Sequence, residues 1–402
     1  MDEQPDDICP RPDFVRPFKT QPLSPPIYTS AVYRCTDPDQ ASRLLGGEEA
    51  GYIYSRDGHP NADLLAEKCR ELHAAERAAV CASGMSALAL AALATLEQGD
   101  HVVISDMLYG RTLQLFTQEL PRFGVSATVV DTCDLEATRR AVATPRTRLL
   151  IVETITNPLL RVSDLTALAE IAHQAEARLL VDNTFAGPTI CRPLEFGADL
   201  VVESLTKVMS GHSDVILGLL CGREANWQRM TSAMSTWGLA SSPFNCWLAL
   251  RGLGTCALRV DRAATNAQAA AEFLAERKEI KAVYFPGLAS HLDHQLARRQ
   301  FTADAGQTRF GTIVTFTFGG GRTVADAFIR AAQRIPFCPS LGDLSTTLSH
   351  PETTSHRGLS VEQREALGIT GGTIRLSLGI ESTAAVLDAL REGLAAVAGG
   401  RQ

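Results

Sequence analysis

The chain has 402 residues, of which 45% are hydrophobic and 21% are charged, and its formal net charge is −7 at pH 7. This composition lies close to the globular average, so we expect a large buried core rather than a globally disordered chain. The length predicts two or three domains rather than a single core. The negative net charge argues against general nucleic-acid binding, which needs a basic surface to neutralise phosphates.

Three features of the sequence favour a cytoplasmic protein without a membrane partner. The first ten residues, MDEQPDDICP, are acidic and lack the basic start and apolar run of a signal peptide. The longest apolar helical stretch, 87–96, is shorter than the roughly 20 residues that cross a bilayer. The ten cysteines are scattered without a CxxC pair, so we expect free thiols in a reducing compartment and no metal site.

Residues 1–62 are expected to form an arm rather than a domain. Seven prolines between positions 5 and 26 remove helix donors and favour extended chain. The dipeptide Gly46-Gly47 and the tripeptide at 59–61 are typical of turns. Apolar residues that have no core of their own must pack on another surface, and a neighbouring subunit is the expected one.

Residues 63–257 alternate short apolar runs with helical patterns, which is typical of a mostly parallel sheet covered by helices on both faces. We expect strands at 101–105, 127–131, 149–153, 178–182 and 199–203. We expect helices at 62–74, 85–96, 134–142 and 164–176. Ligands of such sheets bind beyond the carboxyl ends of the strands. Polar residues at these ends are Ser105, Asn157, Asp182, Asn183 and the segment 204–207.

Residues 258–402 predict a smaller α+β domain. A long helical pattern at 258–277 comes first. Two strand-like runs follow, at 311–318 and 373–380, with a helix between them and another at the end.

Lys207 directly follows the expected strand 199–203, so its amine reaches the edge of the sheet where ligands bind. A lysine in this position can form a Schiff base with an aldehyde. The hydroxyls of Ser204 and Thr206 can bind phosphate oxygens beside it. Taken alone, the lysine is also compatible with an ordinary surface residue.

Asp182 follows the apolar run RLLV, and a carboxylate at a buried strand end is costly unless it is paired. A protonated pyridine nitrogen would be a suitable partner, although a helix cap or a turn explains an isolated aspartate equally well. Ser83, Gly84 and Met85 precede a helical stretch, where free main-chain amides favour an anion. Tyr109 follows another strand end and is able to stack on a flat ring or transfer a proton.

These four elements occur in order, each beyond a strand of one α/β pattern. Together they match the phosphate, the ring, the pyridine nitrogen and the aldehyde of pyridoxal 5′-phosphate (PLP). Each element alone has an ordinary structural explanation, but four coincidences are improbable. The sequence therefore predicts a PLP enzyme that acts on a small amino acid.

Several stretches also resemble the Cys/Met-metabolism family of fold-type I PLP enzymes, which includes cystathionine γ-synthases, cystathionine and methionine γ-lyases and homoserine-ester sulfhydrylases. The resemblance runs from about residue 20 to the C-terminus, and the SxTK…GHSD block is its most specific part. The resembling stretches include YSRDGHP (54–60), ASGMSAL (82–88), ETITNPLL (153–160), VDNTFAGP (181–188), GADLVVESLTKVMSGHSD (197–214), LRGLGTCALRV (250–260), SLGD (340–343) and IRLSLGIES (374–382).

The resemblance implies a role for each matching residue. Lys207 would carry PLP and act in catalysis with Tyr109, which would also stack on the ring, and Asp182 would pair with the pyridine nitrogen. The residues implied to hold the phosphate are Gly84, Met85, Ser204 and Thr206, together with Tyr54 and Arg56 from the adjacent subunit. The residues implied to bind the substrate carboxylate are Asn157, Ser340 and Arg375. Sites shared in this way imply an obligate dimer, usually paired into a homotetramer.

Two reactions on a γ-substituted amino acid remain open. Elimination would yield a 2-oxo acid and ammonia, whereas replacement on an activated homoserine ester would yield a new thioether. β-Elimination from a cysteine conjugate is a third possibility. Methionine γ-lyases carry a cysteine where this chain has Arg111, so we hypothesise that Arg111 binds an anionic group at the far end of the substrate. An outward-facing arginine at a helix start is an equally good explanation.

Two other classes of protein are weaker fits. An NAD-dependent oxidoreductase needs a GxGxxG motif after its first strand, and the nearest match, 252–254, lacks the third glycine and the strand. A catalytically dead homologue would be expected to lack Lys207 or Asp182, and both are present.

Overall fold

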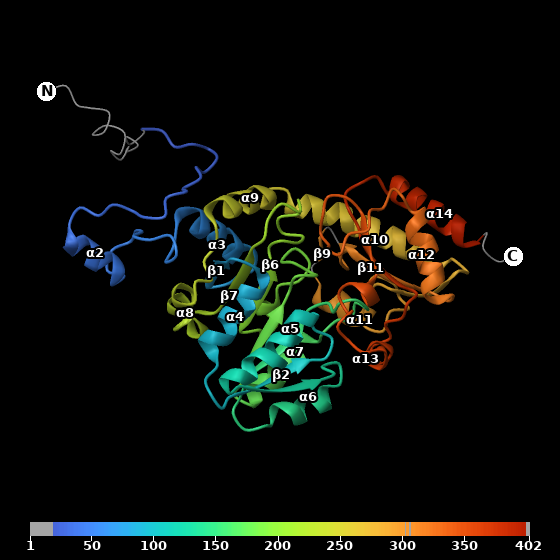
Figure 1. The fold of residues 1–402 in the computed structure, drawn as a ribbon, viewed down its shortest axis with the longest axis horizontal. Helices are drawn as coiled ribbons and strands as arrows, with labels where there is room; N and C mark the ends of the chain where they lie inside the picture. Colours follow the sequence, from blue (N-terminus) through green and yellow to red (C-terminus); the bar gives the residue numbers. More distant parts are fainter. Residues whose placement is uncertain (1–18, 302, 305–306, 399–402) are drawn as a thin grey trace.

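The computed structural model describes residues 19–301, 303–304 and 307–398. A large α/β part, a smaller α+β part and a projecting N-terminal arm are distinct in Figure 1. The prolines of the expected arm that precede Lys19 lie outside the described residues.

A seven-stranded sheet in the order β1-β7-β6-β5-β4-β2-β3 forms the centre of the large part. All strands are parallel except β7, which pairs antiparallel with β1 and with β6. The carboxyl ends of the six parallel strands therefore lie at one edge. The strands are β1 (Arg77–Cys81), β2 (His101–Ser105), β3 (Ser126–Val130), β4 (Thr147–Glu153), β5 (Arg178–Asp182), β6 (Leu200–Ser204) and β7 (Gly218–Gly222).

The five strands expected from sequence are confirmed to within two residues, but β1 and β7 were not expected. β7 reads GLLCG and carries a glycine at each end, which weakens a strand pattern. The glycines are needed because the main chain comes close on both sides. A Cβ on Gly218 would overlap the carbonyl of Ser83, and one on Gly222 would lie 2.6 Å from the carbonyl oxygen of Asp199.

Helices cover both faces of this sheet, and successive strand residues point to opposite faces. On β5, for example, Leu179 and Val181 belong to one core cluster and Leu180 to the other. One face is covered by α3 (Pro60–Leu72), α6 (Leu135–Val142), α7 (Leu165–Gln174) and α9 (Pro243–Leu253). The other face is covered by α4 (Gly84–Thr95), α5 (Gly110–Gln114), its continuations η1 (Leu115–Glu119) and η2 (Leu120–Phe123), and α8 (Met230–Thr236). Short 3₁₀ turns are η3 (Pro193–Phe196) and η4 (Glu224–Asn226).

The smaller part has an antiparallel four-stranded sheet in the order β12-β13-β11-β8. Phe316, Phe318 and Phe328 form the centre of its core, with ring centroids 5.3–5.6 Å apart. The strands are β8 (Ile280–Tyr284), β11 (Ile313–Phe318), β12 (Thr347–Ser349) and β13 (Thr373–Ser377), with a small hairpin of β9 (Ala303–Asp304) and β10 (Gln307–Thr308). The helices are α10 (Cys256–Ala275), α11 (His294–Gln300), α12 (Gly321–Ala331), η5 (Pro351–Thr353), α13 (Val361–Ala366) and α14 (Thr383–Ala398).

Helix α10 connects the two parts. Its first turns place Cys256 and Val260 in a core cluster of the large part, and its later turns place Ala267 and Leu274 in the core of the smaller part. No helix of residues 19–301, 303–304 and 307–398 has the length and apolarity to cross a membrane.

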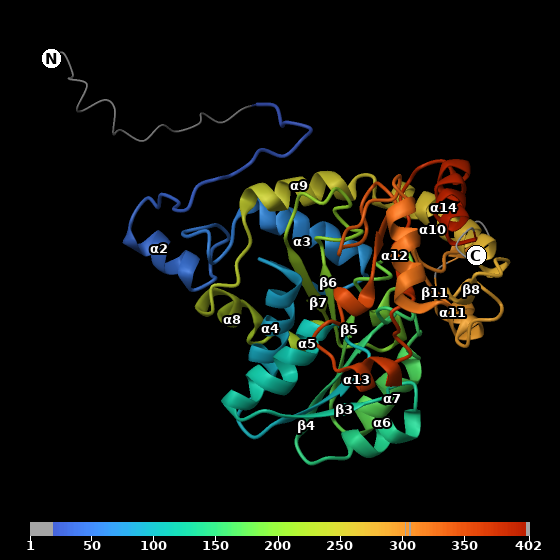
Figure 2. The same ribbon diagram turned by 45° about the vertical axis from the view of Figure 1, so that its right-hand side comes forward.

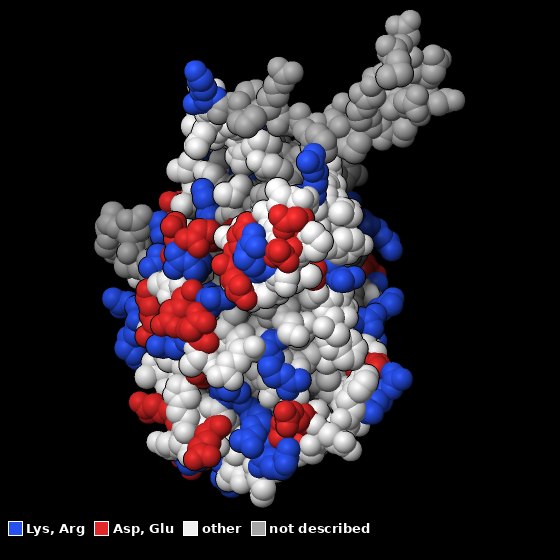
Figure 3. Space-filling view, turned by 90° about the vertical axis from the view of Figure 1, so that its left-hand side faces the viewer, with Lys and Arg blue, Asp and Glu red and all other residues white. Residues whose placement is uncertain are grey.

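The described part of the arm, which includes α2 (Pro38–Leu45), projects away from the body (Figures 1 and 2). Its large apolar side chains Leu23, Tyr28, Val32 and Leu45 are exposed. Charged residues of both signs are scattered over the face seen in Figure 3, without a continuous basic field. The arm thus carries apolar surface that its own chain does not cover.

We predict that Gly218→Ala lowers the free energy of unfolding by about 1–3 kcal/mol, the usual cost of overpacking. The added methyl would meet the main chain at Ser83, which cannot move without shifting the start of α4. Gly319→Ala is the matched control, because no atom lies within 4 Å of its added Cβ. The free energy of unfolding of Gly319→Ala, measured by urea denaturation, should stay within about 0.5 kcal/mol of the wild-type value. Equal stability of the two variants would contradict the close approach.

Candidate functional site

The predicted reactive lysine lies at the carboxyl edge of the large sheet, three residues after β6 ends. Lys207 Nζ donates a hydrogen bond to Ser340 Oγ at 2.9 Å. Burial lowers the pKa of Lys207, and the charge of Arg375 lowers this pKa further. The neutral amine, which is the nucleophilic form, is therefore more accessible than in an exposed lysine.

The loop 340–343 of the smaller part packs directly on Lys207. Gly342 has φ +80°, and a Cβ there would lie 2.5 Å from the main-chain nitrogen of Val208. Gly342 N–H donates to Ser377 Oγ at 2.8 Å, and Ser213 Oγ donates to Asp343 Oδ2. Only glycine combines this close approach with a positive φ. The loop is thereby fixed against the lysine from both sides.

The main chain that follows Lys207 is held by a buried arginine on α10. Arg259 donates from Nη1 to the carbonyl of Val208 at 2.8 Å and from Nη2 to the carbonyl of Met209 at 3.0 Å. A third bond joins Arg259 Nη2 to the carbonyl of Gly252 at 3.0 Å. These bonds satisfy the guanidinium without a carboxylate and fix the course of the chain beyond the lysine.

Asp182, at the end of β5, presents one bonded and one open carboxylate oxygen. Its Oδ1 accepts from Thr184 N–H at 3.0 Å and from Thr184 Oγ1 at 2.6 Å. Within the part of the chain that the structure describes, Oδ2 accepts no hydrogen bond. Burial raises the pKa of Asp182 to about 6, against the lowering effect of the Thr184 bonds. A cationic donor at Oδ2 would offset this desolvation.

The start of α4 lies beside Ser204. Ser83 caps the helix by accepting from Ser86 N–H at 3.0 Å, and Ala87 N–H donates to the Ser83 carbonyl. This leaves the amides of Gly84 and Met85 without partners among the described residues. A Cβ on Gly84 would lie 3.1 Å from Ser204 Cβ. Two free amides at a helix start with a hydroxyl beside them suit a phosphate.

Thr206, the other predicted phosphate-binding hydroxyl, is already bonded within the fold. Its Oγ1 accepts from Leu217 N–H at 3.2 Å and lies 3.3 Å from the Leu217 carbonyl oxygen. In this arrangement the hydroxyl joins the turn after β6 to the chain that leads into β7.

Tyr109 lies at the start of α5, and the residue is 42% exposed. Its main-chain N–H donates to Glu153 Oε1 at 2.7 Å, which fixes the residue from the backbone. An exposed ring at the edge of this sheet is open to stacking by a flat ligand.

Arg375 lies within β13 and is 5% exposed. Its Nη1 donates to Asn157 Oδ1 at 2.8 Å and its Nη2 donates to the carbonyl of Ser340 at 3.0 Å. Its Nε is buried and has no partner among the described residues. Burial lowers the pKa of Arg375 to about 10. An unpaired N–H on a buried guanidinium is a binding position for a carboxylate.

Glu153 is a site residue that sequence reasoning missed, although it ends the apolar run LLIV as Asp182 ends RLLV. The signal that singled out Asp182 was therefore present for Glu153 too. Glu153 is 5% exposed, and its Oε2 has no partner within the described residues. Burial first, and then the charge of Asp182, raise the pKa of this carboxyl. Its Oε1 accepts from the main-chain N–H of Tyr109 at 2.7 Å, and the main chain of Asn157 faces its carboxyl.

The single chain does not bring Tyr54 and Arg56 to this edge. Both are exposed on the arm, where the Arg56 guanidinium lies 5.0 Å from the centroid of the Tyr54 ring. Arg111 is exposed on α5, two residues after Tyr109, and its Nη1 donates to Gln114 Oε1 at 2.7 Å.

These residues fit PLP group by group. Lys207 offers an amine, Asp182 an open carboxylate oxygen and Tyr109 an exposed ring. The amides at the start of α4 offer an anion site. The donor set therefore matches the aldehyde, pyridine nitrogen, ring and phosphate of the cofactor.

Comparison with known proteins agrees with this chemistry. The family model of the Cys/Met metabolism PLP-dependent enzymes matches residues 13–395. The L-methionine gamma-lyase of Porphyromonas gingivalis is 37% identical over 375 residues, which cover 92% of each chain. The O-succinylhomoserine sulfhydrylase of Pseudomonas aeruginosa is 38% identical over 371 residues, covering 92% of this chain and 90% of the relative.

The fold agrees as well. The cystathionine gamma synthase of Xanthomonas oryzae pv. oryzae, solved in complex with cystathionine, superposes with a TM-score of 0.87 at 35% identity and 94% coverage of each chain. The expected fold class, a fold-type I PLP enzyme, is thereby confirmed. The chain belongs to the Cys/Met metabolism PLP-dependent enzyme family, and it is a PLP-dependent enzyme.

Proposed function

We propose that this protein catalyses γ-elimination from a γ-substituted amino acid, such as cystathionine, methionine or a related homoserine derivative. The alternative is γ-replacement on an activated homoserine ester. One observation carries the proposal: an unbroken run of hydrogen bonds joins the amine of Lys207 through Ser340 and Arg375 to Asn157. A group that moves protons and a group that binds carboxylates are thus held in one frame.

In the proposed site Lys207 carries the cofactor, and Asp182 pairs with its pyridine nitrogen through the open Oδ2. When bound, PLP supplies an electron sink for charge that develops on the substrate. Tyr109 lies against the ring. Gly84, Met85, Ser204 and Thr206 would hold the phosphate, with the first two as amide donors at the start of α4 and with Thr206 redirecting the hydroxyl hydrogen that it now donates to the Leu217 carbonyl.

Arg375 orients the substrate, and its hydrogen bonds to Asn157 and Ser340 hold the guanidinium in place. The unpaired Nε of Arg375 and the bonded Nη groups face an α-carboxylate as a fork, which fixes the Cα–H bond relative to Lys207. Burial lowers the pKa of Lys207, so its amine is able to take a proton at Cα and to return it at another carbon. Tyr109 is the second catalytic group, and its phenol transfers a proton that Lys207 does not carry.

Elimination and replacement use the same cofactor site, so the groups around Lys207 do not separate them. The two relatives described above carry names from the two classes at nearly equal identity, 37% and 38%. What differs is the molecule that enters after the leaving group departs, water or a thiol. We place elimination first because SLGD, which includes Ser340 and Asp343, resembles the γ-lyases.

We further propose a cytoplasmic homotetramer, built as a dimer of dimers that share sites. The exposed apolar residues of the arm support an intersubunit role, since they lack a cover in the single chain. Tyr54 and Arg56 would reach the phosphate of the adjacent subunit. All nine cysteines in the described residues are free, which suits a reducing compartment.

The division into arm 1–62, PLP-binding domain 63–257 and C-terminal domain 258–402 is likewise a proposal. The core clusters on either side of α10 support its second boundary.

The reaction is tested with methionine, cystathionine, homocysteine and homoserine esters, each with and without an added thiol. We expect a 2-oxo acid and ammonia in equal amounts whether or not the thiol is present. Thioether formation that depends on the thiol would establish replacement instead.

Lys207→Ala should lose the visible absorbance of the tethered cofactor, and its turnover should fall at least about 1,000-fold, because both the tether and the proton carrier are removed. Turnover that survives this change would refute the proposed function.

We predict that PLP binds more tightly as the pH rises through about 6. Burial raises the pKa of Asp182 to about 6, so below that pH the carboxyl is neutral and cannot pair with a protonated nitrogen. Asp182→Asn should bind weakly at every pH and lose this rise. The phosphate of PLP titrates near pH 6 in both proteins, so the difference between their affinity profiles isolates Asp182. Equilibrium dialysis between about pH 5 and 8 measures it, and profiles of the same shape would contradict the pairing.

Arg111→Ala tests whether this arginine binds an anionic group at the far end of the substrate. We expect kcat/KM to fall about tenfold for cystathionine, which has a distal carboxylate, and little for methionine, which has none. Arg122→Ala is the control, because Arg122 is also exposed and likewise bonded within one helical turn, to Glu119. Equal losses on the two substrates would discard the role of Arg111.

A further inference from the structure

A buried histidine lies next to the substrate-binding residues and has no role in the proposed function. His356 is 5% exposed and belongs to the segment 350–372, which connects β12 to β13 and carries η5 and α13. Buried imidazoles need partners for their ring nitrogens. The partners of His356 belong to the site, as the contacts below describe.

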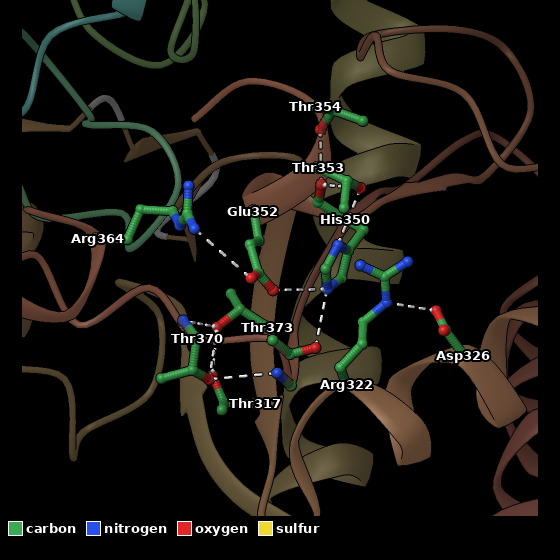
Figure 4. A network of polar contacts seen from close by, with 12 residues as sticks. Thr317, Arg322, Asp326, His350, Glu352, Thr353, Thr354, Arg364, Thr370 and Thr373 are labelled. Carbon is green, nitrogen blue, oxygen red and sulfur yellow. Dashed lines mark hydrogen bonds and ion pairs between the residues drawn. The ribbon is translucent and has the colours of Figure 1, made fainter. Parts of the chain in front are cut away.

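The segment 350–372 is tied together at its base (Figure 4). At its first residue, His350 Nε2 lies 2.8 Å from the carbonyl oxygen of Gly371, and His350 Nδ1 lies 3.0 Å from Thr353 Oγ1. Glu352 bridges the same region, with its carboxylate 3.9 Å from His350 and 3.8 Å from Arg364. These contacts join the two ends of the segment, so the residues between them are held as one unit.

The residues beyond η5 reach across to the large part. The carbonyl oxygen of Ser355 is 3.3 Å from the position of a Cβ on Gly110, directly after Tyr109. A Cβ on Gly368, which has φ +74°, would lie 3.1 Å from a methyl group of Leu159. The segment therefore packs on the two loops that carry Tyr109 and Asn157.

His356 contributes the polar part of this contact. Its ring faces the main-chain carbonyl of Asn157, and its Nδ1 lies 2.8 Å from Ser355 Oγ. Burial and the charge of Arg375 lower the pKa of His356 to about 4, so the ring is neutral near pH 7 and has one N–H to donate. Ser355 Oγ–H then donates to the unprotonated nitrogen.

Asn157 is consequently held at three points by three elements. Its N–H faces the Glu153 carboxyl at the end of β4, its Oδ1 accepts a hydrogen bond from Arg375 on β13, and its carbonyl faces the ring of His356. The contacts with Glu153 and His356 place the peptide, and the hydrogen bond to Arg375 transmits the position of the peptide to the guanidinium. A displaced Asn157 amide would leave Nη1 of a buried arginine unpaired, which is costly.

We propose that His356 is a positioning residue that fixes the peptide of Asn157 and, through it, the orientation of Arg375 toward the substrate carboxylate. This inference rests on the proposed role of Arg375. It assigns to the segment 350–372 a part in recognising the α-carboxylate, while proton transfer stays with Lys207 and Tyr109.

The test compares two amines that differ only by a carboxylate. Norvaline has no γ leaving group, and butylamine is norvaline without its carboxylate; both are titrated into the holoenzyme by the change in visible absorbance. His356→Leu removes the donor at similar volume, and we expect norvaline to bind about tenfold more weakly while butylamine binds within about twofold of wild type. For the reactive substrate KM should rise with kcat largely retained. His356→Gln, which keeps a donor, should recover norvaline binding to within about threefold.

His101→Leu is the matched control for loss of a buried imidazole. His101 is 4% exposed and forms hydrogen bonds with Thr147 and Thr128. It begins strand β2 of the seven-stranded sheet, at the edge opposite the carboxyl ends of the strands. The thermal stability of His101→Leu should fall as much as that of His356→Leu. Its ratio of norvaline affinity to butylamine affinity should stay unchanged. If His356→Leu does not fold, Ser355→Ala removes the partner at Nδ1 and should weaken norvaline binding alone, by about threefold.

Equal weakening of both amines, or of neither, in His356→Leu would overturn the inference, because a purely structural role does not distinguish the carboxylate. A wild-type holoenzyme that responds to neither amine would instead refute the proposed function. The two failures are therefore distinguishable.

Discussion

The hydrogen bond from Lys207 Nζ to Ser340 Oγ connects the two parts of the molecule at the proposed catalytic site. The lysine comes from the large parallel sheet and the serine from the smaller part. The main-chain carbonyl of the same Ser340 accepts from Arg375, so one residue supports both the amine and the carboxylate fork. The geometry of the reaction consequently depends on how the two parts pack, and the loop 340–343 and α10 hold that packing in place.

Burial sets the electrostatics of the site. It lowers the pKa of Lys207 and Arg375 and raises that of Asp182 and Glu153, so each ionised form is less favoured in the folded chain than in water. Asp182 Oδ2 and Arg375 Nε lack partners in the described chain. In the proposed site, a cationic ring nitrogen and an anionic carboxylate would supply these partners. Ligand binding therefore recovers free energy that folding spent on desolvation.

The sequence was sufficient to place at the carboxyl edge of the sheet those candidate residues that end an apolar strand or follow one within a few residues. Lys207, Asp182 and Tyr109 each come after such a run, and parallel strands place their carboxyl ends at one edge. Glu153 carried the same signal and was overlooked. β1 and β7 escaped prediction because alanine and glycine dominate them, and the reason for the glycines is a close approach to Ser83 and Asp199 that local pattern does not contain. Family resemblance was needed for Arg375, Asn157 and Ser340, whose neighbours in sequence do not point to a carboxylate.

By itself, the sequence determined the alternation of strands and helices, the order of the candidate cofactor-binding residues and the negative net charge, because these depend on local periodicity and composition. Only the tertiary structure decided which residues meet across long separations. Lys207 and Ser340 are 133 positions apart, and Arg375 and Asn157 are 218 apart. His356 gains its neutral state and its partner from burial beside Arg375 and Asn157. Such contacts arise from packing between sheets, and no pattern within one segment specifies them.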